Sequence, residues 1–374
     1  MRVVASGYIY DAREAPFHQR STARTTVTRL HDDTLISAFR WGSARESLDG
    51  HECVFASADL GNTWELRYSG FGKGTWDGTP GEVKGFTIAE TAPGELTGTG
   101  LWVDMSNPEL PFVNPETQGL LPMRIFHTTS TDGGRTWGPR RRVDTVPHLA
   151  ASPATAGPMC LPGDVLAQPY EIWKTYDDPS PGRPAAYLRL SYDNGVTWPK
   201  YVTVAKHPTN QLAYWDQRLA IHTETGQIVT MFWTHNLNAE MDCDVHIAWG
   251  TPNGQSWTVP ISTGLPGQHC QPITVGGNRL VAVYSRRRNP PGIATALSTN
   301  FGETWTQPLI IYDSTVGTES GAEGPRRQAE LWNDMIAWRF GHPRGVLLPT
   351  GEVLVVFYAG DDQIKSAHWA RLAL

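Results

Sequence analysis

Apolar runs of strand length alternate with tight polar turns along almost the whole chain, and helical periodicity is nearly absent. Each repeat has an apolar run, a turn and a second apolar run that ends in aromatic or polar residues, which is typical of a β-hairpin. Six copies cover residues 25–40, 85–104, 157–173, 217–233, 271–286 and 343–360. A short helix is expected near Arg326–Met335. The pattern predicts an all-β fold.

A second repeat lies between the hairpins and has the form Ser-x-Asp-x-Gly-x-Thr-Trp. Well-matched copies end at Trp64, Trp137, Trp198 and, with Asn for Asp, Trp305. A degenerate copy ends at Trp257. The Asp or Asn side chain accepts backbone N–H groups, the glycine permits positive φ, and the tryptophan packs the turn against its own sheet. Six hairpins, five of them followed by such a turn, predict a β-propeller of six four-stranded antiparallel blades.

The two ends of the chain are expected to meet in the last blade. The sixth hairpin continues into Ile364–Leu374 without a tryptophan turn. We therefore expect the N-terminal strand around Val3–Tyr10 to complete this blade and close the ring. The result is one domain over residues 1–374, with no linker.

Composition and charge exclude several classes of function. The chain has 31 Lys and Arg against 37 Asp and Glu, a formal net charge of -6, so a nucleic-acid partner is not expected. No apolar run approaches the roughly 18 residues of a membrane span, so no membrane partner is expected. The start lacks a secretory pattern, which predicts a cytoplasmic protein unless a signal peptide has been removed. Cys53, Cys160, Cys243 and Cys270 are widely spaced, so no disulfide framework, metal site or cofactor is predicted.

The tryptophan turn resembles the Asp-box of the sialidase (neuraminidase) superfamily, and the resemblance extends over nearly the whole chain. It implies a six-bladed sialidase-like propeller, whose site lies where innermost strands begin and second strands end, on the face opposite the Asp-boxes. These stretches hold many of the Arg, His, Trp and carboxylate residues. The substrate-binding candidates among them are Arg24, Arg40, Trp41, Glu171, Trp215, Arg218, Trp233, His235, Arg286 and Arg344.

Sialidases use an arginine triad, an aspartate acid/base, and a tyrosine nucleophile activated by a glutamate. Arg24 is available for the first arginine, shifted by one place and without the following Ile-Pro, while the rest of the triad has no clear match. Asp49 lies where the acid/base belongs. Asp216 replaces the glutamate and His342 replaces the tyrosine. The resemblance therefore implies Asp49, Asp216 and His342 as catalytic residues, with Asp216 and His342 forming a carboxylate–imidazole pair.

Three functions fit these residues, each with a carbohydrate as partner. The first is an exo-glycosidase that hydrolyses a terminal sugar, acidic sugars included, with Asp49 and Asp216 as the carboxylates. The second is a polysaccharide lyase, with His342 abstracting a proton from a uronate whose carboxylate is neutralised by Arg218 or Arg24. The third is a glycan-binding propeller without catalysis. The hydrolase is preferred, and the sequence indicates neither the sugar linkage nor the oligomeric state.

Overall fold

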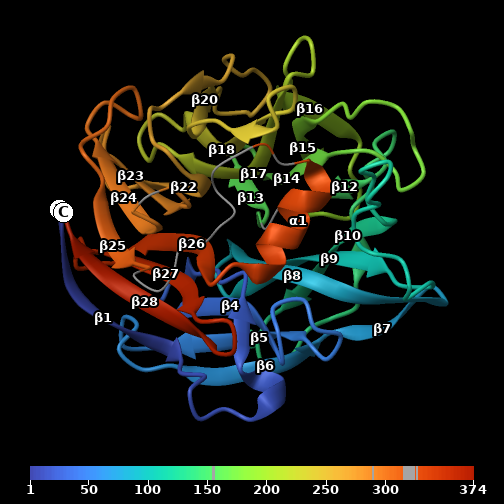
Figure 1. Ribbon diagram of the computed structural model, residues 1–374. Helices are drawn as coiled ribbons and strands as arrows, with labels where there is room; N and C mark the ends of the chain where they lie inside the picture. Colours follow the sequence, from blue (N-terminus) through green and yellow to red (C-terminus); the bar gives the residue numbers. More distant parts are fainter. Residues whose placement is uncertain (154–155, 289, 315–324, 326) are drawn as a thin grey trace.

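Antiparallel hairpins form most of the computed structural model, which describes residues 1–374 except 154–155, 289, 315–324 and 326. Within the described part of the chain the strands form five sheets, arranged around a common centre as a β-propeller (Figure 1). All six predicted hairpins are present. The described segments contain no helix long and apolar enough to span a membrane.

Both ends of the chain lie in one nine-stranded sheet. Its strands are β1 (Arg2–Tyr10), β2 (Ser21–Ala23), β3 (Thr28–Arg29), β4 (Leu35–Gly42), β5 (His51–Ser57), β6 (Glu65–Phe71), β26 (Phe340–Leu347), β27 (Val353–Gly360) and β28 (Lys365–Ala373). β1 pairs antiparallel with β28 from Arg2 opposite Ala373 to Tyr10 opposite Ala367. The N-terminal strand thus lies beside the C-terminal strand.

The other four sheets follow one another along the chain. The second holds β7 (Lys73–Trp76), β8 (Thr79–Ala92), β9 (Glu95–Asp104), β10 (Met123–Ser130) and β11 (Arg141–Arg142). The third holds β12 (Ala151–Ser152), β13 (Met159–Leu161), β14 (Val165–Ile172), β15 (Ala185–Ser191) and β16 (Lys200–Ala205). The fourth holds β17 (Leu212–Ile221), β18 (Ile228–Asn236), β19 (Met241–Asp242), β20 (His246–Gly250) and β21 (Ile261–Ser262). The fifth holds β22 (Gln268–Thr274), β23 (Leu280–Arg286), β24 (Gly292–Ser298) and β25 (Leu309–Asp313).

The Asp-box turns have the predicted hydrogen bonds. In four copies the threonine N–H donates to the Asp or Asn Oδ1 at 2.8–3.0 Å. The glycine of each copy has positive φ, for example 91° at Gly61 and 94° at Gly302. Each turn joins the two outer strands of its sheet, as between β5 and β6. The turns are thus structural, and they leave the opposite ends of the strands available for a site.

Bulges interrupt the innermost strands where they approach the centre of the ring. The pairing register shifts between Trp215 and Arg218 in β17, and equivalent shifts occur in β8, β22 and β26. A residue with positive φ lies at each shift: Asp216 at 52°, His269 at 44°, His342 at 47° and Gly85 at 87°. A bulge re-aims a side chain, and a left-handed residue other than glycine costs about 1–3 kcal/mol. Regular packing on either side of each bulge offsets that cost.

Two helices complete the described structure, a 3-10 turn at Phe17–Gln19 and α1 (Gln328–Ala337). α1 is the helix expected near Arg326–Met335, although Arg326 itself lies outside the described residues. Its N-terminal turn is fixed by the Ala329 N–H, which donates to Gln118 Oε1 at 2.7 Å. At the other end Arg45 donates to the carbonyl of Met335, and the Arg287 guanidinium lies 3.8 Å from the centre of the Trp338 ring. α1 is thereby held against loops from several sheets.

Candidate active site

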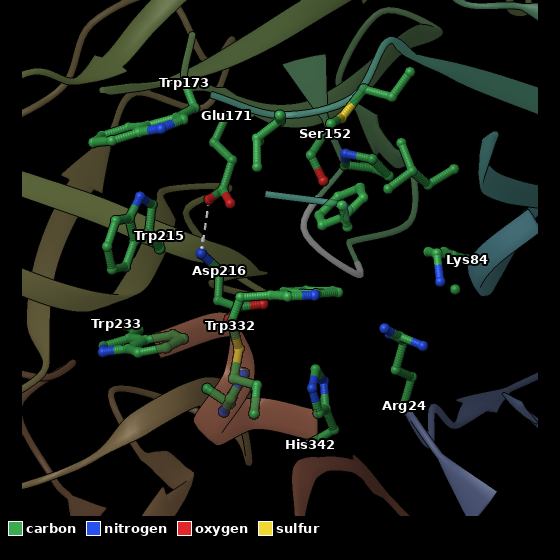
Figure 2. A pocket seen from close by; sticks show the side chains of 18 of the residues that line it. Arg24, Lys84, Ser152, Glu171, Trp173, Trp215, Asp216, Trp233, Trp332 and His342 are labelled. Atoms are coloured by element: carbon green, nitrogen blue, oxygen red, sulfur yellow. Dashed lines mark hydrogen bonds and ion pairs between the residues drawn. The ribbon is translucent and has the colours of Figure 1, made fainter. Parts of the chain in front are cut away.

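A cavity lies where the innermost strands approach the centre of the ring, and α1 forms one of its walls (Figure 2). Its polar lining includes Arg24, Arg45, Lys84, Ser152, Glu171, Asp216, His269 and His342. Its aromatic lining is Phe112, Trp173, Trp215, Trp233 and Trp332. Arg24, Asp216, His269 and His342 all have positive φ. These four residues with a left-handed backbone therefore all place polar side chains in the cavity lining.

Two carboxyl groups meet inside the cavity. Glu171, at the end of β14, accepts the backbone N–H of Asp216 on its Oε2 at 2.8 Å (Figure 2). Burial, and then the negative charge of Asp216, raise the pKa of Glu171 well above its usual range. The raised pKa means that Glu171 retains its proton more readily than an ordinary glutamate, so it is the carboxyl group of this pair that is suited to donate a proton.

Asp216 is surrounded by donors. Its Oδ2 lies 3.1 Å from His269 Nε2, and its Oδ1 lies 3.7 Å from the Arg218 guanidinium. Burial, and then the charges of Arg218 and Arg287, lower the pKa of His269 well below its usual range. A neutral His269 carries its hydrogen on Nε2, because the Asp216 carboxylate only accepts hydrogen bonds. These contacts stabilise the ionised form of Asp216.

The predicted pairing of Asp216 with His342 is corrected by this geometry. The imidazole bonded to Asp216 is that of His269, and His342 lies behind it, with ring centroids 4.1 Å apart. His342 Nε2 lies 3.5 Å from the Arg45 guanidinium. Burial, and then His269 and Arg45, lower the pKa of His342 well below its usual range. The bulges in β22 and β26 bring the two histidines together, a proximity that strand alternation does not predict.

The opposite side of the cavity is cationic (Figure 2). Arg24, Lys84 and Arg45 all contact the carboxylate of Glu46, with Lys84 at 3.1 Å and Arg45 at 3.5 Å. Burial acts to raise the pKa of Glu46, but Arg24, Lys84 and Arg45 outweigh it and hold that pKa below its usual range. Lys84 also pairs with Glu82, with Nζ 2.6 Å from Oε1. The three cations line the cavity whereas Glu46 and Glu82 do not, so an anionic group of a ligand would meet the cations first.

Six predicted site residues line the cavity: Arg24, Glu171, Trp215, Asp216, Trp233 and His342. The remaining seven do not belong to the described lining: Asp49, Arg40, Trp41, Arg218, His235, Arg286 and Arg344. Arg40 is buried between sheets and donates to the carbonyls of Val83 and Ser47. Trp41 is buried in the core and donates to His51 Nε2. These contacts give Arg40 and Trp41 a structural role outside the cavity.

Arg218 and His235 contact residues of the cavity lining without lining it themselves, whereas the structure gives Asp49 no such contact. Arg218 is fully buried and donates to the carbonyls of His269 and Pro343, so it braces the strands that carry the histidines. His235 stacks on Trp215, with ring centroids 5.1 Å apart. Asp49 is exposed and accepts hydrogen bonds from the N–H and Oγ of Ser43. Arg286 and Arg344 are half-buried at strand positions.

Sequence reasoning missed Arg45, Lys84, Trp173, His269 and Trp332. Lys84 and His269 lie at the bulges of innermost strands, and this position on the site face could have identified them. Neither residue matched a sialidase motif. Trp332 comes from α1, which belongs to no repeat. Within the described residues, no three His, Cys, Asp or Glu side chains are grouped so that they could hold a metal ion.

The fold and the site together define a β-propeller with a central cavity in which two carboxyl groups lie close together. Residues 104–353 match the BNR repeat-like domain family, and the chain belongs to this family. No curated protein sequence matches the chain.

Solved structures have the same fold at low sequence identity. A protein of unknown function from Dyadobacter fermentans DSM 18053 aligns with a TM-score of 0.71 and 18% identity, over 100% of this chain and 99% of the other. The Hadza microbial sialidase Hz136 aligns with a TM-score of 0.66 and 13% identity, over 99% of this chain and 68% of the other. An α-L-arabinanase of Penicillium chrysogenum, complexed with arabinobiose, aligns with a TM-score of 0.63 and 13% identity, over 99% and 98%. At these identities the likeness establishes the fold.

Proposed function

We propose that the protein is an exo-glycosidase that hydrolyses a terminal sugar carrying a carboxylate, with Glu171 as general acid and Asp216 as the second carboxyl group. The observation that carries the proposal is that Glu171, whose pKa is raised, lies beside an Asp216 that is bonded to His269 and near Arg218. Glycoside hydrolysis generally uses such a pair, one carboxyl group protonated and the other ionised. The pair favours a hydrolase over the lyase and over the glycan-binding propeller.

Each polar group has a role in this reaction. Glu171 donates its proton to the glycosidic oxygen as the bond to the anomeric carbon breaks. Asp216, whose charge is supported by the His269 N–H, faces the positive charge that develops at that carbon. Water supplies the hydroxyl of the product, and its remaining proton returns to the carboxyl pair. His342 keeps His269 in place rather than acting as a base.

The cationic side gives the preference for an acidic sugar. Arg24, Lys84 and Arg45 line the cavity, whereas the carboxylates that pair with them, Glu46 and Glu82, lie outside the lining. A substrate carboxylate there would gain charge-assisted hydrogen bonds. α1 covers part of the cavity, which suits the removal of a terminal sugar better than binding within a long chain.

We further propose that the propeller has six blades in one domain over residues 1–374. The nine-stranded sheet divides into β26, β27, β28 and β1 on one side and β2 to β6 on the other. The two halves are connected by a single parallel pair, Ser21 opposite Lys365. With this division the N-terminal strand completes the last blade and closes the ring.

The test is one incubation with sialosides, aryl glycosides and uronate polysaccharides, read in two channels. Released sugar without ultraviolet absorbance is expected, and Asp216→Asn should abolish it while the circular dichroism spectrum stays unchanged. Absorbance from an unsaturated uronate would overturn the hydrolase in favour of the lyase. Binding without either signal, unaffected by Asp216→Asn, would overturn it in favour of the glycan-binding propeller.

A further inference from the structure

We propose that the substrate carries an apolar leaving group, an alkyl or aryl alcohol, which binds between α1 and Glu171. This inference rests on the proposed hydrolase and names the chemistry of the group that Glu171 protonates. It follows from the division of the cavity into a charged side and an apolar side.

The apolar side is formed by two segments far apart in the sequence. α1 contributes Leu331, Trp332 and Met335, and the loop before β10 contributes Phe112 and Leu120. The rings of Trp332 and Phe112 lie 4.5 Å apart. Trp332, Phe112 and Leu120 belong to one hydrophobic cluster, in which side chains exclude water from one another. An apolar wall that lines an open cavity favours a ligand group of the same kind.

This apolar side adjoins the general acid. Ile172 and Trp173 follow Glu171 directly, and both line the cavity. Leu120 is tied to the same segment, because its N–H donates to the carbonyl of Lys174 at 3.0 Å. The indole N–H of Trp173 is already used by the carbonyl of Gln118 at 2.6 Å. Among the described residues, the lining of the cavity between Glu171 and α1 is therefore mainly apolar, with Ser152, on the strand paired with β14, as a polar member.

The chemistry of the reaction decides which part of the substrate lies there. A general acid must contact the oxygen that it protonates, so the leaving group lies beside Glu171. The sugar carboxylate lies toward Arg24 and Lys84, which Figure 2 places across the cavity from Glu171. A sugar leaving group would lose hydrogen bonds to water against Leu120, Leu331 and Met335, whereas an alkyl or aryl group would gain from its burial.

Alkyl glycosides test this, because methyl, butyl and octyl alcohols differ little in acidity. The probes are the three glycosides of whichever sugar the wild-type enzyme releases, used below the micelle-forming concentration of the octyl compound. We expect kcat/KM to rise by about tenfold or more from methyl to octyl, since each buried methylene group contributes to binding. A kcat/KM that does not depend on chain length would overturn the proposal.

Two variants on α1 provide the matched comparison. Met335→Gln keeps the side-chain volume and the helix propensity but makes the cavity face polar. Ile336→Gln makes the same kind of change on the solvent side, where Ile336 is 41% exposed. We expect Met335→Gln to reduce kcat/KM about fivefold more for the octyl glycoside than for the methyl glycoside, with Ile336→Gln like wild type. Equal effects of the two variants would contradict the proposal.

A binding measurement separates this inference from the proposed function. If no glycoside is cleaved, hydrolysis is overturned, and fluorescence titration with anilinonaphthalene sulfonate still tests the apolar side. We expect Met335→Gln to weaken binding of the dye several-fold and Ile336→Gln to leave it unchanged. Equal binding to all three proteins would overturn the apolar subsite itself. Thermal unfolding of each variant verifies that the fold is retained.

Discussion

Replacing Glu171 by glutamine removes a proton donor while keeping the shape of the side chain. The Gln carbonyl can still accept the Asp216 N–H, which donates to Glu171 Oε2 at 2.8 Å. The bulge that carries Asp216 therefore retains its backbone contact. What the substitution removes is the acidic proton, and with it a titrating group next to Asp216.

The size of the effect should depend on the leaving group. General acid catalysis contributes about 10²–10⁴-fold, so kcat/KM for an alkyl glycoside should fall about 10³-fold, equivalent to about 4 kcal/mol. A nitrophenyl glycoside leaves without protonation, and its loss should stay below about tenfold. Steady-state kinetics on the matched pair of substrates measures the difference. Equal losses for both substrates, or no loss for either, would refute the role of Glu171 as an acid.

The pH dependence gives a second readout of the same residue. Burial and Asp216 raise the pKa of Glu171, so activity should fall as the pH rises through that raised value, and Glu171→Gln should lack this decline. The folded protein holds a proton that the unfolded chain releases above about pH 4.3. Wild type should therefore lose stability as the pH rises from there toward the folded pKa, and the variant should not. Calorimetry at several pH values checks the sign.

Three further substitutions test other parts of the structure. Arg24→Gln should raise KM about 10- to 100-fold for a glycoside with a carboxylate and about twofold or less for a neutral one, because a charged hydrogen bond is lost; equal changes would contradict an anionic substrate. Asp49→Asn should keep activity within about twofold, since Asp49 is exposed and outside the cavity lining; a large loss of kcat would restore it as the acid. Hydrogen bonds from Thr136 lower the pKa of Asp132, so Asp132→Ala should lower Tm at pH 7. The difference in Tm between wild type and Asp132→Ala should shrink as the pH falls below about 4. A Tm difference that stays constant with pH in calorimetry would contradict a stabilising role of the ionised Asp132.

The fold was largely predictable because its signals are local. An Asp-box specifies its own hydrogen bonds within eight residues, and each hairpin carries its turn between two apolar runs. Even α1 was visible as a break in the strand pattern. The number of blades follows from counting these units, since neighbouring blades need no sequence signal beyond their apolar faces.

The site was only partly predictable because a bulge changes which way a side chain points. Asp216 and Arg218 both begin the same strand, yet Asp216 lines the cavity and Arg218 is buried under it. His269 matches no residue of the sialidase pattern, so the resemblance did not identify it as a site residue. The apolar side of the cavity depends on where α1 packs, and that is decided by contacts such as Gln118 with Ala329, more than 200 residues apart.

The left-handed bulges have a consequence for how this family can change its chemistry. Asp216, His269 and His342 belong to different blade hairpins, and in each the regular ladder resumes within a few residues. Any residue that tolerates the left-handed backbone can occupy such a position without altering the strands around it. The three side chains contact one another, so an exchange at one position affects the other two side chains but not the strands that hold them. A substitution at Asp216, His269 or His342 therefore changes the chemistry of the cavity while the strands that form the propeller stay the same.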